Sequence, residues 1–293
     1  MTQRRTLALI GLILLMIMWG STFVVTKATA REIPAATLAA LRFLIATLVL
    51  LPIAWKQGGL SLLPRPIPWM SLGLMALTGI TGFAITFNYG LVYGSAAQGA
   101  LIYAALPASI ALAAFVFLKE RPSRRRIAGI VFSVLGVALL IAAGERDAGS
   151  PDPLAGALWM IGAVISWTAY TVVSKRTSGS DSVISITVVS ALGTLMLLPG
   201  AAIELANHSW QSPSISTWMG LLFLGVIASA LAYLVYGYAL RELDASLVGV
   251  YTNLDPIVGV LIAVLLFGET LHSGQIVGGL IAFTGMWLAS AEH

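Results

Sequence analysis

The sequence predicts an all-α polytopic membrane protein whose ten transmembrane helices form two five-helix repeats of inverted topology. Three observations support this fold class. Apolar residues (AVILMFWYC) make up 58% of the 293 residues, charged residues make up only 10%, and the mean hydropathy is +0.94. The apolar residues fall into runs of about 20, the length that an α-helix needs to cross a bilayer. The two halves of the sequence also resemble each other.

This composition excludes several classes of protein. A soluble domain carries roughly 25% charged residues, and a chain with so few polar groups cannot cover its own exterior in water. A soluble enzyme, a nucleic-acid-binding protein and a disordered chain are therefore excluded. The sequence has no cysteine, which excludes disulfides, thiolate metal sites and cysteine nucleophiles.

Charges and clusters of Gly, Pro and Ser divide the chain into ten apolar runs, which we expect to be the spans. They cover about residues 7–27, 34–56, 67–90, 95–118, 124–143, 154–174, 182–203, 216–239, 245–267 and 274–291. The boundary at 91–95 carries no charge, and we place it there because an undivided run of about 50 residues would far exceed a bilayer. The first span has features of a signal peptide, but its apolar stretch is too long and has a second copy in mid-chain. We expect it to be retained.

The basic residues predict the orientation, because cytoplasmic loops are enriched in Lys and Arg. Twelve of the 16 Lys and Arg residues fall on one side, namely Arg4, Arg5, Lys56, Arg65, Lys119, Arg121, Arg124, Arg125, Arg126, Lys175, Arg176 and Arg241. The other side receives Lys27, Arg31 and Arg146, and Arg42 lies inside the second span. We therefore expect both termini to be cytoplasmic.

Residues 1–147 and 148–293 are the two expected repeats, aligned at an offset of about 148 residues. The matched residues include Trp19 with Trp167, Lys27 with Lys175, Pro107 with Pro256, Glu120 with Glu269, Gly129 with Gly278, and Gly136 with Gly285. Five is an odd number of spans, so the second repeat enters the membrane from the opposite side. Secondary transporters use such inverted repeats and bind their substrate near the midplane between them.

In these features the sequence resembles the drug/metabolite transporter superfamily and, within it, the ten-span EamA-type exporters. The resemblance covers the whole chain and rests on the repeat, the early-span tryptophans, the prolines of spans four and nine, and the glycine-rich spans five and ten. The Arg42-Phe43 and Gly268-Glu269 pairs also match the family, whereas Lys119-Glu120 departs from it at the small residue. The resemblance implies export of small metabolites across the bacterial plasma membrane. Members export amino acids, including an aromatic amino-acid exporter subgroup, or nucleotide sugars, purine-like compounds or cationic drugs.

Trp19 and Trp167 lie past the centres of their spans, about 18–20 Å along the helix, and outside the interfacial belts where tryptophan is common. Thr22 shares a helix face with Trp19, and Tyr170 shares the matching face with Trp167. We expect these faces to line a substrate cavity. The alternative is helix packing, which small hydroxylated residues also serve.

Pro107 and Pro256 lie near the middle of spans four and nine, where proline removes a backbone hydrogen bond. Tyr103 precedes the first proline, and Tyr251 and Asn253 precede the second. We expect these spans to line the site and to bend during the transport cycle. The alternative is a static kink that packs.

Asp255 is expected near the midplane, where a charge costs from about 2.5 kcal/mol upward. Its counterpart in the first half is Leu106. We expect Asp255 to relay a proton or to bind the ammonium group of a substrate. In the alternative it pairs with Arg42 or caps the break at Pro256. Arg42 could instead snorkel toward the membrane surface.

Phe83 and Phe87 of span three and Tyr233 of span eight complete the expected substrate-binding set. A cavity walled by rings and hydroxyls suits a flat, partly polar solute, and the same rings would attract a cation. The alternative is ordinary packing. Glu120 and Glu269 are expected to cap the helices that follow them.

Catalytic and metal sites are not expected. The three histidines, His208, His272 and His293, lie in loops or at the terminus, and no HExxH or GxSxG motif is present. From the absence of catalytic and metal-binding motifs we expect no cofactor and no enzyme activity. The absence of an ATP-binding motif excludes primary pumping by this chain alone.

We predict a secondary transporter that exports small amphipathic metabolites by alternating access, with amino acids, and among them aromatic ones, as the favoured solutes. A multidrug or cationic-compound exporter is the second hypothesis, and a channel or membrane scaffold is the third. The expected partners are a small-molecule substrate and membrane lipids, with no nucleic acid. The chain would be a monomer or a lipid-facing homodimer in the bacterial plasma (inner) membrane.

Overall fold

The computed structural model describes residues 3–63, 65–119, 123–142, 150–177, 182–207, 211–242, 251 and 253–290, and every regular element in these ranges is helical. In chain order the elements are α1 (Gln3–Thr29), α2 (Ala35–Lys56), η1 (Gly59–Leu62), α3 (Trp69–Met75), η2 (Ala76–Gly82), α4 (Phe83–Tyr93), α5 (Ala96–Tyr103), α6 (Leu106–Leu118), α7 (Arg124–Ala142), α8 (Pro153–Arg176), α9 (Val183–Asn207), α10 (Ile215–Leu222), η3 (Phe223–Leu231), α11 (Ala232–Glu242), α13 (Leu254–Phe267) and α14 (Ser273–Ser290). The predicted all-α class is confirmed.

Seven helical segments of the described chain are long and apolar enough to cross a membrane. They are Gln3–Thr29, Ala35–Lys56, Trp69–Tyr93, Ala96–Phe117, Pro153–Arg176, Val183–Asn207 and Ile215–Tyr236. Three shorter apolar helices are Ile127–Ala142, Leu254–Phe267 and Ser273–Ala289. Each segment overlaps one expected span. The count of ten crossings stays a prediction, because three helices are short and residues 245–250 of the ninth span lie outside the described ranges.

The uncharged boundary at 91–95 is confirmed by a break between two helices. α4 ends at Tyr93, and α5 begins at Ala96. Gly94 between them is extended, with φ −101° and ψ −177°. The hydroxyl of Ser95 accepts a hydrogen bond from the backbone N–H of Gln98 at 3.0 Å, and this N-cap starts α5.

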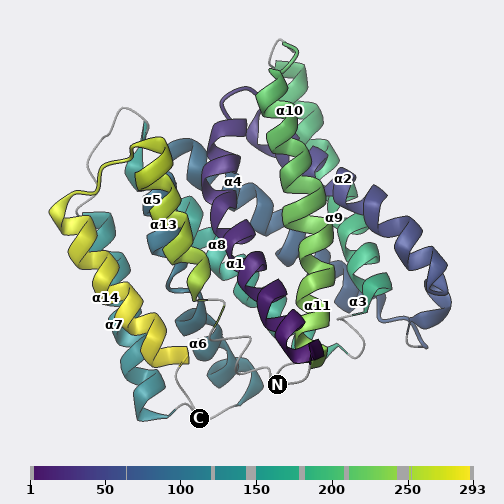
Figure 1. Cartoon of the computed structure of the whole chain (residues 1–293), viewed down its shortest axis with the longest axis horizontal. Coiled ribbons are helices and arrows are strands. Elements are labelled where there is room, and N and C mark those ends of the chain that lie inside the picture. The colour runs from purple at the N-terminus through teal and green to yellow at the C-terminus, as the bar shows by residue number, and fades with distance from the viewer. Residues whose placement is uncertain are drawn as a thin grey trace.

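The helices pack as a bundle in which distant segments lie side by side. α7 packs along α14 at one edge, α2 packs along α9, and α1 contacts α13 and α11 (Figure 1). The start of α1 and the end of α14 lie at the same end of the bundle (Figure 1). At the α7–α14 contact, Gly129 lies against Gly285 and Gly136 against Gly278, so the two backbones touch.

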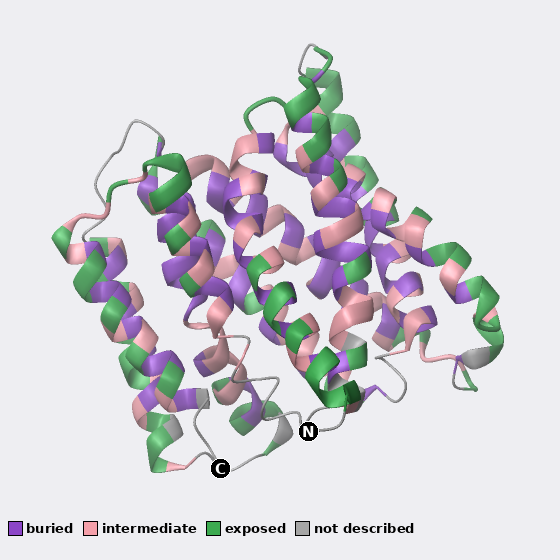
Figure 2. Cartoon of the chain, in the orientation of Figure 1, coloured by how far each residue is buried: buried purple, intermediate pink, exposed green. Residues whose placement is uncertain are grey.

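Burial separates an interior from an apolar exterior. Figure 2 shows buried residues where helices face one another and exposed residues on the outer faces. Along α1, for example, Leu12 and Leu15 are buried, whereas Leu7, Ile10 and Leu14 are exposed. An exterior with so many large apolar side chains fits contact with lipid.

The third and eighth expected spans each contain a π-helical segment, which was not predicted from the sequence. η2 follows α3, and η3 follows α10. Such segments often occur at functional sites, because they displace backbone carbonyls and side chains from the regular helical register. Both supply contacts to the residues described below.

Candidate functional site

Two helix breaks place polar groups inside the bundle. α5 ends at Tyr103 and α6 begins at Leu106, with Pro107 as its second residue, and Pro256 is the third residue of α13. Proline fits the first turn of a helix, because its missing N–H would have no helical partner there. The interruption expected at Pro107 is therefore present, and both prolines mark helix starts. Helix N-termini carry partial positive charge, and transporters use broken helices of this kind at their binding sites.

Six rings from four helices form a continuous group, here called the aromatic cluster: Phe23, Phe83, Phe87, Tyr103, Trp167 and Tyr170. The Phe83 ring centroid lies 5.0 Å from that of Trp167 and 5.2 Å from that of Phe87. Phe23 lies 5.1 Å from Phe87, and Trp167 lies 5.1 Å from Tyr170. The structure thus brings together five predicted binding residues. Phe23 was not among the predicted site residues, although it lies four residues after Trp19 and so shares a helix face with it.

The aromatic cluster is packed against itself in this conformation. Phe23 and Phe87 are only 1% and 2% exposed, and Tyr103 is 8% exposed. Ring pairs at these distances contribute about 0.5–1.5 kcal/mol each beyond area burial. A flat solute would have to separate these rings in order to stack between them.

Trp19 and Trp167 have different surroundings, although the repeat aligns them. The Trp19 indole N–H donates to the carbonyl of Ala228 in η3 at 3.1 Å, and its ring lies 5.6 Å from Tyr236. Trp19 and Tyr251 pack against the same apolar group on α1 and α11. The Thr22 hydroxyl donates to the Trp19 carbonyl at 2.6 Å and is therefore satisfied within its own helix.

Five polar residues form a second group, here called the polar cluster: Arg42, Tyr103, Ser229, Tyr233 and Asp255. The Arg42 Nε donates to the Ser229 hydroxyl of η3 at 2.9 Å, and both side chains are buried. Tyr233 and Tyr103 lie within electrostatic range of Arg42, and Asp255 lies within that range of Tyr103. Ser229 was not among the predicted site residues, although a hydroxyl inside an apolar span is a signal for one.

Asp255 lies in the first turn of α13 and is 9% exposed. Its Oδ1 is buried and has no hydrogen-bond partner among the described residues, and no ion pair joins it to Arg42. The alternative in which these two residues pair is therefore absent from this conformation. A buried carboxylate oxygen without a partner is costly, so this group is suited to take up a proton or a cation. Asn253 directly precedes α13.

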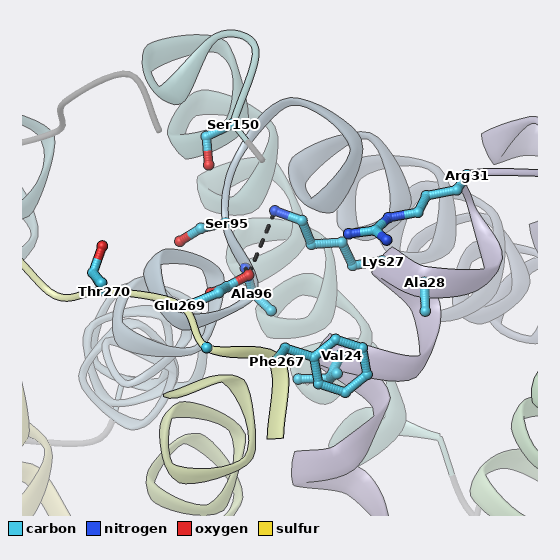
Figure 3. Close-up of a pocket in the computed structure, with 11 residues that line it drawn as sticks. Val24, Lys27, Ala28, Arg31, Ser95, Ala96, Ser150, Phe267, Glu269 and Thr270 are labelled. Carbon is cyan, nitrogen blue, oxygen red and sulfur yellow. Dashed lines mark hydrogen bonds and ion pairs between the residues drawn. The ribbon is translucent and has the colours of Figure 1, made fainter. Parts of the chain in front are cut away.

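A cavity of about 440 Å³ lies at the end of the bundle where α1 ends, and we call it the α1-end cavity. Lys27 and Arg31 line it from α1 and the loop that follows, together with Val24, Ser95, Phe267 and Glu269. Figure 3 shows the Lys27 and Arg31 side chains extending toward the same space, with Glu269 near Lys27. None of the predicted site residues lines this cavity.

Glu269 connects three elements at this cavity. One carboxylate oxygen accepts the N–H of Ala96 at 3.0 Å and the other accepts that of Ala97 at 2.8 Å. The Lys27 Nζ lies 3.5 Å from Glu269 and donates to the Gly94 carbonyl at 2.7 Å. The expectation that Glu269 caps the following helix is wrong.

The physical reason is the chain turn before Glu269. Gly268 adopts the left-handed conformation, with φ 63°, and ends α13 beside the start of α5, whose first N–H groups need acceptors. Glu120, the aligned residue of the first half, lies outside the described residues. From the sequence, Lys27 and Arg31 are assigned to the distribution of charges that sets orientation, and Lys27 also to the internal repeat, but neither to a site. Their spacing of one helical turn was the signal that could have pointed to the cavity.

Comparison with known proteins places the chain among transporters. The sequence model of the EamA-like transporter family matches residues 6–142 and again residues 154–291. An uncharacterized transporter of Archaeoglobus fulgidus is 30% identical over 285 residues, which cover 96% of each chain. A protein of Salmonella typhimurium named probable amino-acid metabolite efflux pump is 30% identical over 294 residues, covering 94% of this chain and 92% of its own length.

A crystal structure shares the fold with a TM-score of 0.66 at 21% identity, and the match covers 97% of this chain and 96% of that one. Together with the apolar helices, the matches show a multi-pass membrane protein. They point to a transporter and not to an enzyme.

Proposed function

This chain belongs to the EamA-like transporter family, and from this membership we propose that it is a ten-helix secondary transporter that exports small amphipathic metabolites by alternating access. Amino acids are the proposed solutes, and aromatic ones are favoured. The name of the Salmonella typhimurium relative supports the amino-acid class. The aromatic cluster beside the polar cluster supports a solute with both a ring and charged groups.

We propose that residues 1–147 and 148–293 are inverted repeats. At the α7–α14 contact, Gly129 meets Gly285 and Gly136 meets Gly278, which is a reciprocal pairing of aligned positions. The π-helical segments η2 and η3 and the helix starts at Pro107 and Pro256 also occupy aligned positions. Such pseudo-symmetry supports two states of similar energy that open to opposite sides of the membrane.

The observation that carries the proposal is the position of Asp255. Its carboxylate has a buried oxygen without a hydrogen bond to the described residues, lies in the first turn of α13, and is within electrostatic range of Tyr103, as is the buried cation Arg42. A buried carboxylate that is not paired with the nearby cation can gain and lose a proton as the bundle rearranges. We propose that Asp255 and Arg42 act in coupling or gating, and that Pro107 and Pro256 permit the bending.

The remaining predicted residues are assigned to solute contact. Five of them belong to the aromatic cluster, and opening of that cluster would present their rings to a solute. The full set is Trp19, Thr22, Phe83, Phe87, Tyr103, Trp167, Tyr170, Tyr233, Tyr251 and Asn253. The sequence contains no ATP-binding motif, so an ion gradient or the gradient of the solute itself would drive export.

The proposed setting is the bacterial inner membrane with both termini cytoplasmic, as the distribution of basic residues predicts. In this orientation the α1-end cavity opens to the outside. The proposed partners are the solute and membrane lipids, with the chain acting as a monomer or as a lipid-facing homodimer.

Counterflow in proteoliposomes tests the proposal. Vesicles are preloaded with single amino acids or cationic dyes, and the uptake of labelled tryptophan is followed. We expect preloaded aromatic amino acids to accelerate uptake, because the loaded carrier returns faster than the empty one. Tryptophan flux that ignores the preload would indicate a channel instead.

Export of cationic compounds is the second candidate, and the buried unpaired Asp255 oxygen favours it. In that case Asp255→Asn abolishes export of cations and spares neutral zwitterions. Dye movement without tryptophan flux in the counterflow assay would support this candidate.

A further inference from the structure

The α1-end cavity combines positive charge with an apolar wall. Arg31 is exposed, and its side chain has no hydrogen bond or ion pair to any described residue. The hydroxyl-bearing residues Ser95 and Thr270 also line the cavity, while Val24 and Phe267 supply apolar surface. A volume of about 440 Å³ lies within the range of small-molecule sites.

The ion pair at this cavity is long, and Glu269 does not depend on it for its hydrogen bonds. The Lys27 Nζ lies 3.5 Å from Glu269, which is longer than a charge-assisted hydrogen bond of about 2.7–2.9 Å. Both Glu269 oxygens already accept backbone N–H groups of α5. Glu269 therefore keeps two hydrogen bonds when Lys27 turns to another anion.

The α1-end cavity also lies along the elements that form the inner clusters. Val24 lines it and follows Phe23 of the aromatic cluster in α1. Ala96 lines it and starts α5, the helix that ends at Tyr103. α13 runs from Asp255 to the cavity wall at Phe267. Two residues of the wall, Val24 and Ala96, belong to the same packed core as Phe87 and Tyr103.

We infer that the α1-end cavity is a release site for the carboxylate group of the exported solute. This inference rests on the proposed function and names the solute class more narrowly, as a small amphipathic carboxylate. Arg31 binds the carboxylate, which then takes the place of Glu269 beside Lys27. The apolar part of the solute lies against Val24 and Phe267. Charge attraction draws the solute out of the bundle, and exposure of Arg31 to water limits how tightly it is held.

Right-side-out membrane vesicles that contain the full chain test the site, because added solute then meets the outer face. The vesicles are loaded with unlabelled tryptophan, and uptake of labelled tryptophan is measured against its external concentration. Tryptophanamide, which lacks the carboxylate charge, is added as an external competitor. Inside-out vesicles give the same measurements for the inner face.

We expect Arg31→Gln to raise the half-saturating external tryptophan concentration about tenfold, the usual range for a lost hydrogen bond to a charged group. Inhibition by tryptophanamide and half-saturation at the inner face should stay unchanged. Arg31→Lys should restore most of the outer affinity. Lys56→Gln removes an exposed cation at the opposite end of the bundle and is the matched control. Lys56→Gln should leave the half-saturating tryptophan concentration unchanged at both faces.

Each other result has a defined meaning. An Arg31→Gln protein with normal outer affinity overturns the release site and leaves the proposed function intact. Arg31→Gln also overturns the release site if it weakens tryptophan affinity equally at the two faces, because the site lies at the outer face alone. The same holds if it weakens inhibition by tryptophanamide equally, because a carboxylate site should not bind a solute that lacks the carboxylate. A wild-type protein that exchanges only cationic dyes overturns the carboxylate class. A wild-type protein that exchanges no solute of the panel removes the proposed function and the release site together.

Discussion

Gly136 of α7 and Gly278 of α14 lie so close that a Cβ atom on Gly136 would come within 2.7 Å of the Gly278 carbonyl oxygen. Real Cβ atoms do not approach other atoms this closely. The obstacle is backbone, which cannot rotate away as the tip of a side chain can. The contact between α7 and α14 therefore depends on the absence of a side chain at Gly136.

The first prediction is that Gly136→Ala destabilises the protein by about 2–3 kcal/mol, because overpacking a close contact forces the two helices apart. Thermal unfolding of the purified protein in detergent measures the loss. Gly73→Ala is the control, since a Cβ at Gly73 in α3 meets nothing within 4 Å. Alanine favours the helix there by up to about 1 kcal/mol, so its melting temperature should stay equal or rise. Similar losses for both variants would contradict the packing argument.

The second prediction concerns Asp255. We expect Asp255→Asn to remove the acceleration of tryptophan export by a proton gradient, because asparagine has similar size and cannot carry a proton. Exchange of tryptophan for tryptophan should continue, since it needs no net proton movement. Export from proteoliposomes with and without a pH gradient measures the first effect, and counterflow measures the second. Loss of exchange itself would assign Asp255 to solute binding, and unchanged stimulation would make it structural.

Much of the fold can be predicted from local sequence patterns, namely the lengths of apolar runs and the positions of prolines. Apolar length places most helices, and the break near Gly94 follows from the bilayer thickness alone. The prolines predict helix interruptions, because the lost N–H acts locally. The five predicted residues of the aromatic cluster were expected at the site on three separate grounds: the aromatic density of span three, the place of Tyr103 before Pro107, and the helix face that Trp167 shares with Tyr170.

Other features depend on contacts between segments far apart in the sequence, and no local pattern contains them. A glutamate near a helix start is expected to accept backbone N–H groups. Which helix Glu269 caps depends on the end of α13 lying beside the start of α5. The close packing of η3 on α2 is of this kind, since Gly225 of η3 lies against Ile45 and the Arg42 carbonyl. Ser229 reaches Arg42 only because of that packing. Trp19 and Trp167 looked equivalent in the alignment, and their neighbours make them different.

The third prediction is a pH dependence at Glu32, in the loop between α1 and α2. The backbone N–H of Ser214 donates to its carboxylate at 2.6 Å and the Ser214 hydroxyl donates at 2.8 Å. These bonds, the backbone one first, lower the pKa of Glu32 below its ordinary value of 4.5. A lowered pKa means that the link stabilises the fold above pH 4.5. The stabilisation is lost as the pH falls through the folded-state pKa.

Melting temperatures of wild type and Glu32→Gln between pH 7 and pH 3 check this prediction. The variant should melt lower by a constant amount down to about pH 5, and the two curves should converge below pH 4.5. Ser214→Ala keeps the backbone N–H, but it removes both the hydroxyl bond to Glu32 and the N-cap of α10, so part of its loss should not change with pH. A difference that stays constant to pH 3 would show that Glu32 does not titrate in this range.

The fourth prediction concerns the buried pair of Arg42 and Ser229. Arg42→Lys keeps the positive charge, but a lysine has no donor at the position of Nε and no planar fork, so the bond to Ser229 is lost. Polar bonds between membrane helices average about 0.6 kcal/mol and reach about 1.7 kcal/mol. A bond to a buried cation should fall at the upper end of this range. Ser229→Ala should cost a similar amount, because it leaves the Arg42 Nε unpaired.

A double-mutant cycle separates this bond from other effects of each substitution. If the bond carries the loss, the double variant is about as stable as Arg42→Lys alone. Additive losses would mean that each residue acts through other contacts. Counterflow rates of the same four proteins test the gating role, because a link between α2 and η3 must rearrange when the bundle opens. Transport that is unchanged in a protein whose stability is reduced would make Arg42 a packing residue, and slowed exchange with normal half-saturation would support its part in the conformational step.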